Sequence, residues 1–507
     1  MLSRRFVLAA GLTAMTLPRA KGWAASQKVS PQDLALVDVL TWGVTPSLLD
    51  DFLALGREKW LRAQLKPPSR QQVPADVQQQ IDALTISPQS VVDLARDFET
   101  EARTAKMITD PAERAKAKKL HQTAMIDIAR QAETVSILRA LYSPDQLGER
   151  MTWFWFNHFN VYQGKGNIRV LVGDYEHNAI RRHALGYFRD LVMATLCHPA
   201  MMRFLDNADN RVGHVNENYA REIMELHTMG VGSGYTQQDV EQLARILSGA
   251  GIDFQSDDPR LKRKWQPLLV RDGAFLFNPA RHDFSDKIFL GQTINGSGFP
   301  EIEQAVDMLC AHPATARHIA HRIALYFVSD YPPEALVTRM AQRFTQSRGH
   351  IPSVLDTMIR SPEFMASLGT RFKEPVRYVY SAVRMAYDGK VIVNTAPIQS
   401  WLKQLSEGLY NRLTPDGYPL ESSAWSSSGQ MMARFDIAHR IGSGAAALFR
   451  LPGEDGAGES ALPVLQNGLY FDAWRATLSR QTQAALDKAT SPQEWNTLFL
   501  SSPEFMS

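Results

Sequence analysis

The chain has 507 residues, of which 44% are hydrophobic and 21% charged, with a formal net charge of +2. This composition is ordinary for a folded globular protein, and the small net charge argues against nucleic acid or an anionic membrane as a partner. The two cysteines, Cys197 and Cys310, are too few for a disulfide framework. We expect either two separate buried thiols or a single bridge.

The N-terminus has the layout of an export signal. Ser3-Arg4-Arg5 is followed by a modestly apolar stretch from Phe6 to Leu17 and by small residues at Ala24-Ala25. Paired arginines before a weakly apolar run are typical of the twin-arginine route. The alternative is a short helical anchor that is never cleaved. We expect residues 1–25 to be a twin-arginine signal peptide and the protein to act in the periplasm or outside the cell.

Helical spacing of apolar residues dominates the rest of the chain. No other apolar run is long enough to span a bilayer, so no transmembrane segment is expected in the mature chain. The basic run 113–119 has no aromatic residues among its charges, which indicates a solvated helix face instead of a nucleic-acid site. We expect a mainly α-helical body over residues 26–450, a loop or linker at 451–463, and C-terminal helices packed on the body at 464–507.

A short β element interrupts the helical pattern in the middle of the chain. Two apolar runs, 268–270 and 275–277, flank Asp272-Gly273, which is typical of a tight two-residue turn. We therefore expect a small β-hairpin near residues 268–278, inserted in a multi-helical protein.

The segment from Asn216 to Met229 is predicted to be a helix closed by Gly230. At about 100° per residue, Asn218, Glu222 and Glu225 lie on one face of this helix. Paired carboxylates on one face can hold a hard cation or take part in acid–base chemistry. The alternative is structural, with a surface ion pair from Arg221 to Glu225 and Glu222 bonded to another helix.

Histidines add to this candidate site. His158 lies in the aromatic run 154–159, where a buried, hydrogen-bonded role is the alternative to metal binding. His282-Asp283 follows the expected hairpin, in a loop position where functional groups often lie. His318 and His321 also have a spacing that metal ligands use. The candidate ligands of a divalent metal are His158, Glu222, Glu225 and His282. The candidate catalytic residues are the same four with Asn218, His227 and Asp283.

Several motifs spread along the chain form a recognisable set. They are 154–159, 216–230 with 235–240, 277–283, 312–316, 361–364 and 413–419. Together they resemble a large bacterial family catalogued as domain of unknown function 1800. The resemblance covers nearly the whole mature chain and implies an exported, helix-rich protein. Members are often encoded beside exported proteins that resemble sulfatases and alkaline phosphatases, which implies such a protein as a partner.

Two hypotheses for the function follow. The first is a non-catalytic binding or assembly protein that acts with a hydrolase-like partner in the cell envelope, because no standard catalytic motif is present. The second is a metal-dependent hydrolase that uses the Glu/His cluster. The hydrolase hypothesis requires His158, Glu222, Glu225 and His282 to converge in one concave pocket.

Overall fold

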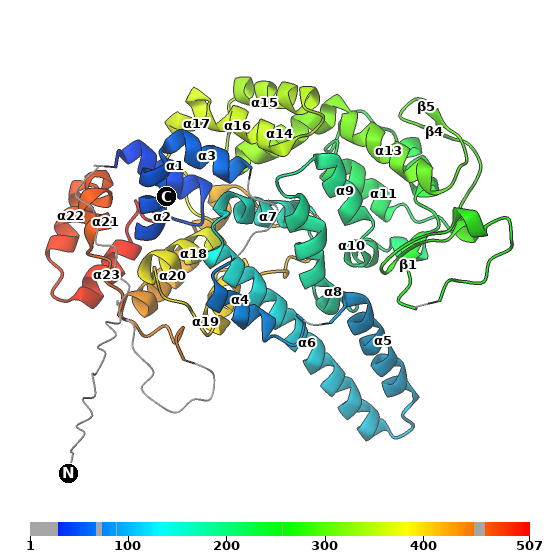
Figure 1. Ribbon diagram of the computed structural model, residues 1–507, viewed down its shortest axis with the longest axis horizontal. Helices are drawn as coiled ribbons and strands as arrows, with labels where there is room; N and C mark the ends of the chain where they lie inside the picture. The colour runs from blue at the N-terminus through cyan, green and yellow to red at the C-terminus, as the bar shows by residue number, and fades with distance from the viewer. Residues whose placement is uncertain (1–28, 67–72, 88, 256, 451–461) are drawn as a thin grey trace, which may run out of the picture.

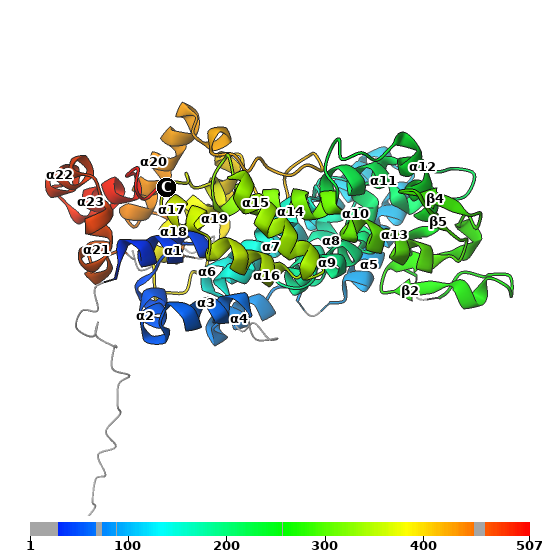
Figure 2. The same cartoon turned by 90° about the horizontal axis from the view of Figure 1, so that it is seen from above.

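The computed structural model describes residues 29–66, 73–87, 89–255, 257–450 and 462–507. The expected signal peptide and most of the expected loop at 451–463 lie outside these residues. Within them the fold is mainly α-helical, as the periodicity predicts, and the strands are short (Figure 1). The molecule is elongated, with α21–α23 at one end and the strands at the other (Figures 1 and 2). No helix in the described parts is long and apolar enough to cross a membrane.

The first described helices are held by capping residues and by close packing. Ser30 and Thr45 accept backbone N–H groups at the starts of α1 and α2, and a proline follows each cap. Gly43, between these helices, has a φ of 101°, and a Cβ there would lie 2.4 Å from the Cβ of Ser381. The chain therefore passes against α18 at a point where only glycine fits. These helices are α1 (Pro31–Leu40), α2 (Pro46–Leu55), α3 (Arg57–Leu65) and α4 (Ala75–Asp82).

A helical hairpin of α5 (Val91–Met107) and α6 (Pro111–Tyr142) projects from the body as an arm (Figure 1). Asp110 caps α6, with Pro111 at its first position. The basic run predicted to be solvated begins α6, and its charged residues Glu113, Lys116, Lys118 and Lys119 are exposed.

The core is centred on α7 (Gln146–His158), in which every residue is buried. This explains why the aromatic run of the sequence lies here, since a helix packed on all sides must be apolar or hydrogen-bonded all round. Around it lie a π-helix, η1 (Tyr175–Ile180), and further helices α8 (Ile168–Asp174), α9 (Phe188–Leu196) and α10 (Pro199–Phe204).

The expected hairpin is confirmed. Strands β2 (Val270–Asp272) and β3 (Phe275–Phe277) pair antiparallel, with Asp272 opposite Phe275. The sequence did not indicate β1 (Ala250–Ile252), which completes the sheet in the order β1-β3-β2, or the hairpin of β4 (Lys287–Phe289) and β5 (Gln292–Ile294). Strands of three residues are too short for a two-residue period to be distinguished. They follow α12 (Gln237–Ile246), which begins with a capping box formed by Thr236 and Asp239.

The second half of the chain is helical again. The repeated pentapeptide Ser-Pro-Glu-Phe-Met follows α16 and α23, and in each copy the serine hydroxyl accepts the N–H of a buried phenylalanine. The helices are α13 (Phe299–Ala311), α14 (Pro313–Phe327), α15 (Glu334–Gln346), α16 (Ile351–Ile359), α17 (Pro362–Ser367), α18 (Pro375–Ala386), α19 (Ala396–Gln404), α20 (Ser428–Gly442), α21 (Gly468–Asp472), α22 (Arg480–Asp487) and α23 (Pro492–Leu500). Short 3₁₀ turns are at Arg181–His183, Asn207–Asp209, Gln266–Leu268, Pro279–Arg281, Ser422–Trp425 and Trp474–Thr477.

A buried ionic cluster joins α1 to the start of α18. Asp38 lies 2.7 Å from Arg377 and 3.4 Å from Lys373, and the three side chains are almost completely buried. Burial alone would raise the pKa of Asp38, but Lys373 and Arg377 lower it below its ordinary value. Burial, together with the charge of Arg377, lowers the pKa of Lys373 to about 8.

Cys197 and Cys310 are both free thiols in this structure. Burial raises the pKa of Cys197 to about 12, and it raises that of Cys310 further. The expectation of two separate thiols therefore fits the fold.

Candidate functional site

The polar segment at 216–230 is not a regular helix. It begins as α11 (Asn218–Glu222) and widens into a π-helix, η4 (Ile223–His227). The Thr228 hydroxyl donates to the Ile223 carbonyl (2.6 Å), and the N–H of Gly230 donates to the Met224 carbonyl (3.1 Å). Gly230 has a φ of 90°. The segment is thus an α-turn followed by a π-turn, a feature frequently found at functional sites.

Two imidazoles bind the end of this π-helix. Nε2 of His158 donates to the carbonyl of His227 (3.0 Å), and Nε2 of His318 donates to that of Leu226 (3.2 Å). The Nε2 atoms of His158 and His318 must each carry the hydrogen, because the carbonyl oxygen that each one contacts can only accept. The ring of His158 lies 6.1 Å from that of His227 and 6.0 Å from that of His318, measured between centroids. We call His158, His227 and His318 the histidine cluster.

The histidine cluster is neutral at pH 7. Burial, with the charge of Arg322, lowers the pKa of His158 well below its ordinary value. For the same two reasons the pKa of His318 is lowered to about 4. Burial, with His318 and Arg322 nearby, lowers the pKa of His227 to about 3. Nε2 of His227 is buried and has no hydrogen-bond partner in the described part of the chain. The neutral ring of His227 therefore has a nitrogen that could still form a hydrogen bond, and its low pKa keeps the ring uncharged.

Arg322 places a cation next to this cluster. It lies one turn after His318 on α14, and its buried Nε has no acceptor. No carboxylate of the described residues lies within 4 Å of its guanidinium. Burial lowers the pKa of Arg322, whereas Glu421 and Asp416 act to raise it from a greater distance. Arg322 is therefore a largely desolvated cation without a direct counter-ion in this part of the fold.

The loop from Arg412 to Leu420 lies against the end of α7. The side chain of Asn157 accepts from the N–H of Tyr418 (2.6 Å) and donates to its carbonyl (2.9 Å). Asn160 donates to the carbonyls of the same loop at Arg412 and Thr414. A Cβ at Gly417 would lie 2.1 Å from the backbone oxygen of Asn157, so only glycine allows this approach. The loop is thereby held where Asp416 can act on both Arg322 and Glu222.

The two carboxylates of the segment, Glu222 and Glu225, differ in their partners. Glu225 pairs with Arg221 at 3.6 Å, the surface ion pair of the structural alternative. Glu222 forms no hydrogen bond or ion pair with the described residues, so the other half of that alternative, a bond to another helix, is absent there. Burial raises the pKa of Glu222, and the charge of Glu225 raises it further. Asn218 points elsewhere and donates to the Leu205 carbonyl (3.2 Å).

His282 and Asp283 belong to a separate network in the β region. Nδ1 of His282 donates to the Ser248 carbonyl (2.7 Å), and its Nε2 lies 2.9 Å from Glu301. Glu301 also binds Lys287, and all three ionisable side chains are fully buried. Burial would raise the pKa of Glu301, but the hydrogen bonds from His282 and Lys287 lower it.

Asp283 pairs with Arg245 of α12 at 2.8 Å. This network therefore fastens the loop after β3 to α12 and α13. The partners of His282 and Asp283 do not include any member of the histidine cluster.

The candidate residues thus fall into two groups. His158, His227, Glu222 and Glu225 lie around the π-helix, and His282 with Asp283 lies in the β region. Among the residues that the structure describes, no three His, Cys, Asp or Glu side chains are grouped so that they could hold a metal ion. The sequence did not single out Arg322 or Asp416. The available signals were the one-turn spacing of Arg322 from His318 and the position of Asp416 inside the motif at 413–419.

Comparison with known proteins gives a family. The family model described as "Protein of unknown function (DUF1800)" matches residues 35–507. The chain belongs to this family. No curated protein and no solved structure matches it. Three of its DUF1800 motifs, at 154–159, 216–230 and 413–419, are far apart in the sequence and meet around the histidine cluster, whereas the motif at 277–283 lies in the β region.

Proposed function

We propose that this protein is a non-catalytic binding or assembly protein of the cell envelope. Its binding face is the surface formed where α11, η4, the start of the Arg412–Leu420 loop and the end of α14 meet. The observation that carries the proposal is the pair of opposite charges, Glu222 and Arg322, which have no direct counter-ion among the described residues. A desolvated charge left alone costs stability, and a partner with complementary charges recovers part of that cost.

The protonation of the histidine cluster supports binding over catalysis. A general acid or base works best when its pKa is near the working pH. The pKa of His227 is about 3 and that of His318 about 4, and each of His158 and His318 already donates a hydrogen to a backbone carbonyl. These rings fix the shape of the π-helix and stay neutral beside Arg322.

Exposed apolar residues close in sequence to Glu225 and Asp416 support a protein partner. Val231 directly follows the π-helical segment and is 76% exposed, and Leu413 precedes Asp416 and is 66% exposed. Apolar anchors surrounded by charged groups are the usual composition of a protein interface. The partner we propose is the exported sulfatase-like or phosphatase-like protein that the family resemblance implies.

Binding to that partner tests the proposal. The purified chain would be immobilised and titrated with an exported sulfatase-like or phosphatase-like protein from the same organism. We expect Val231→Asp and Leu413→Asp each to weaken binding about tenfold or more, the loss typical of an interface anchor. Ile288→Asp is the matched control, because Ile288 is 59% exposed but lies in β4. No binding by the wild type, or equal losses in all three variants, would refute the proposed face.

Export is the second part of the proposal, and it rests on the arginine pair at the N-terminus. The twin-arginine pathway reads the two arginines as an address, so replacing Arg4-Arg5 by two lysines is expected to leave precursor in the cytoplasm. Fractionation followed by immunoblotting measures this. Normal accumulation of the variant in the periplasm would show that another route is used.

A further inference from the structure

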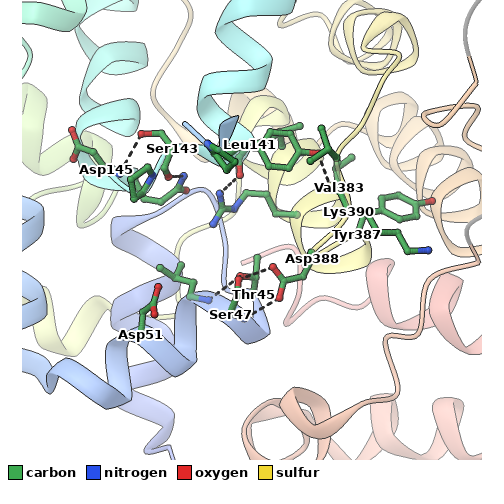
Figure 3. A pocket seen from close by; sticks show the side chains of 18 of the residues that line it. Thr45, Ser47, Asp51, Leu141, Ser143, Asp145, Val383, Tyr387, Asp388 and Lys390 are labelled. Carbon is green, nitrogen blue, oxygen red and sulfur yellow. Dashed lines mark hydrogen bonds between the residues drawn. The ribbon is translucent and has the colours of Figure 1, made fainter. Parts of the chain in front are cut away.

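A pocket of about 860 Å³ lies where α2, α3, the junction of α6 and α7, and the end of α18 meet (Figure 3). None of its lining residues belongs to the histidine cluster. Much of its wall is apolar and includes Leu48, Trp60 and Val391. Pockets of this size and character hold small organic ligands in many proteins.

Arg384 is the polar group that distinguishes this pocket. Its Nη1 donates to the carbonyls of Leu141 and Ala140 at the end of α6. Its Nε is buried and has no acceptor, and no carboxylate of the described residues lies within 4 Å of the guanidinium. Burial lowers the pKa of Arg384 to about 10, which still leaves it charged at pH 7. The pocket wall therefore includes a partly buried cation without a direct counter-ion among the described residues.

The nearest carboxylate is already engaged. Asp388 accepts from the backbone N–H of Ser47 (2.9 Å) and from its hydroxyl (2.7 Å). This places its charge at the N-terminus of α2, where a helix dipole favours an anion. Among the carboxylates that line the pocket, Asp388 alone acts on the pKa of Arg384.

Three other carboxylates line the pocket, those of Asp51, Asp76 and Asp145. Figure 3 shows Asp51 and Asp145 on one side of the view and Lys390 on the other. Asp145 accepts the N–H of Gly148 (3.0 Å) as the cap of α7. Lys390 is exposed, and the backbone around it is tied to the pocket because its carbonyl accepts the hydroxyl of Tyr142. Arg384 and Lys390 thus supply the positive charges of the pocket wall, and Asp388 is the lining carboxylate that acts on Arg384.

We propose that this pocket binds an amphipathic organic anion whose acidic group pairs with Arg384 and Lys390 and whose apolar body lies along Leu48, Trp60 and Val391. An anion would accept from the guanidinium of Arg384, which lines the pocket, in a charge-assisted bond that is stronger than a neutral one. It would also give the buried guanidinium a counter-ion. The apolar body would cover hydrophobic wall, which favours binding in proportion to the area buried.

Calorimetric titration with decanoate, below its micelle concentration, tests this assignment. We expect saturable one-to-one binding of decanoate. Decanol and decyltrimethylammonium should bind at least about tenfold more weakly, because only decanoate carries a negative charge that can pair with Arg384. Absence of saturable decanoate binding would overturn the proposal. Equal or tighter binding of decanol or of the cation would overturn it as well.

Variants locate the site. Arg384→Met is expected to weaken decanoate binding at least about tenfold, since it removes the charged donor and keeps most of the volume. Ala54→Trp fills the pocket from an exposed position and is expected to abolish binding, whereas Ala112→Trp on the exposed start of α6 is the control. Thermal melts establish that each variant folds, and Lys390→Gln replaces Arg384→Met if that variant does not. Unchanged affinity in Ala54→Trp would place decanoate elsewhere and refute the site.

Discussion

Replacing Asp38 by asparagine removes the only carboxylate that directly contacts Lys373 and Arg377 in the described structure. The substitution preserves volume, so no cavity is created. The two cations then remain buried with Arg150 nearby, which also acts on the pKa of both. Removing one partner of a buried ion pair typically costs about 3–5 kcal/mol, because the remaining charge is uncompensated. We expect the free energy of unfolding to fall by about this amount at pH 6.

The loss should shrink as the pH rises. In the wild type the pKa of Lys373 in the folded protein is about 8, below its ordinary value of 10.5. The unfolded chain therefore binds more protons between these values, and this group makes stability increase with pH over that interval. Without Asp38 the folded pKa of Lys373 falls further, so Lys373 loses its proton at a lower pH. The variant consequently recovers part of its stability between pH 6 and 9.

Urea denaturation followed by circular dichroism at pH 6 and pH 9 measures both effects. Asp307→Asn is the control, because Asp307 pairs with Arg189 at 2.7 Å on the surface and such pairs contribute about 0–1 kcal/mol. A loss below about 1 kcal/mol for Asp38→Asn would refute the view that this cluster is a desolvated ionic core. A loss of the same size at both pH values would refute the role of Lys373.

Four further outcomes follow from the site and its surroundings. Gly417→Ala is expected to lower the free energy of unfolding by at least about 2 kcal/mol, because Gly417 has a φ of 75° and a Cβ there would collide with the backbone oxygen of Asn157. Gly429→Ala is the control, because a Cβ there meets open space and the change should be neutral or stabilising. Thermal melts compare the two variants. Glu301→Gln should lower the free energy of unfolding by about 3–5 kcal/mol, since Lys287 and His282 lose their carboxylate partner. Hydrogen exchange in the β region should increase as well. Unchanged exchange there would contradict the role of Glu301. The pKa of Glu222 is raised in the folded protein, so the wild type should become more stable as the pH falls through that pKa. Glu222→Gln should lack this gain in stability. Thermal melts from pH 7 to pH 4 measure the difference. We also expect Mg, Ca, Mn and Zn to shift both melts equally, and a shift confined to the wild type would instead favour a metal site.

The sequence predicts the helices well, because a 3.6-residue period is sampled several times in each long helix. It also predicts the hairpin at Asp272-Gly273, since that turn has its own residue preference. The π-helix at 223–227 leaves no such sign, because five residues cannot distinguish one helical period from another.

The structure brings only some of the candidate residues together. His158 and His227 are brought together, but His282 is held by Glu301 in another part of the molecule. Distances between helices depend on tertiary packing, which spacing within one helix does not encode. Arg322 was missed for the same reason, since its importance comes from what α14 packs against.

The π-helical turn also makes the site depend on chain length. A π-turn contains one residue more than the α-turn it replaces, and one residue corresponds to about 100° of rotation around a helix axis. An ordinary α-turn formed at unchanged length would rotate His227 by about 100° away from His158 and His318, whereas deleting Met224 together with the change to an α-turn would leave His227 facing them. For related chains, the number of residues between Glu222 and Gly230 therefore indicates which kind of turn is present: a copy shorter by one residue is expected to keep the three histidines together around an ordinary α-turn.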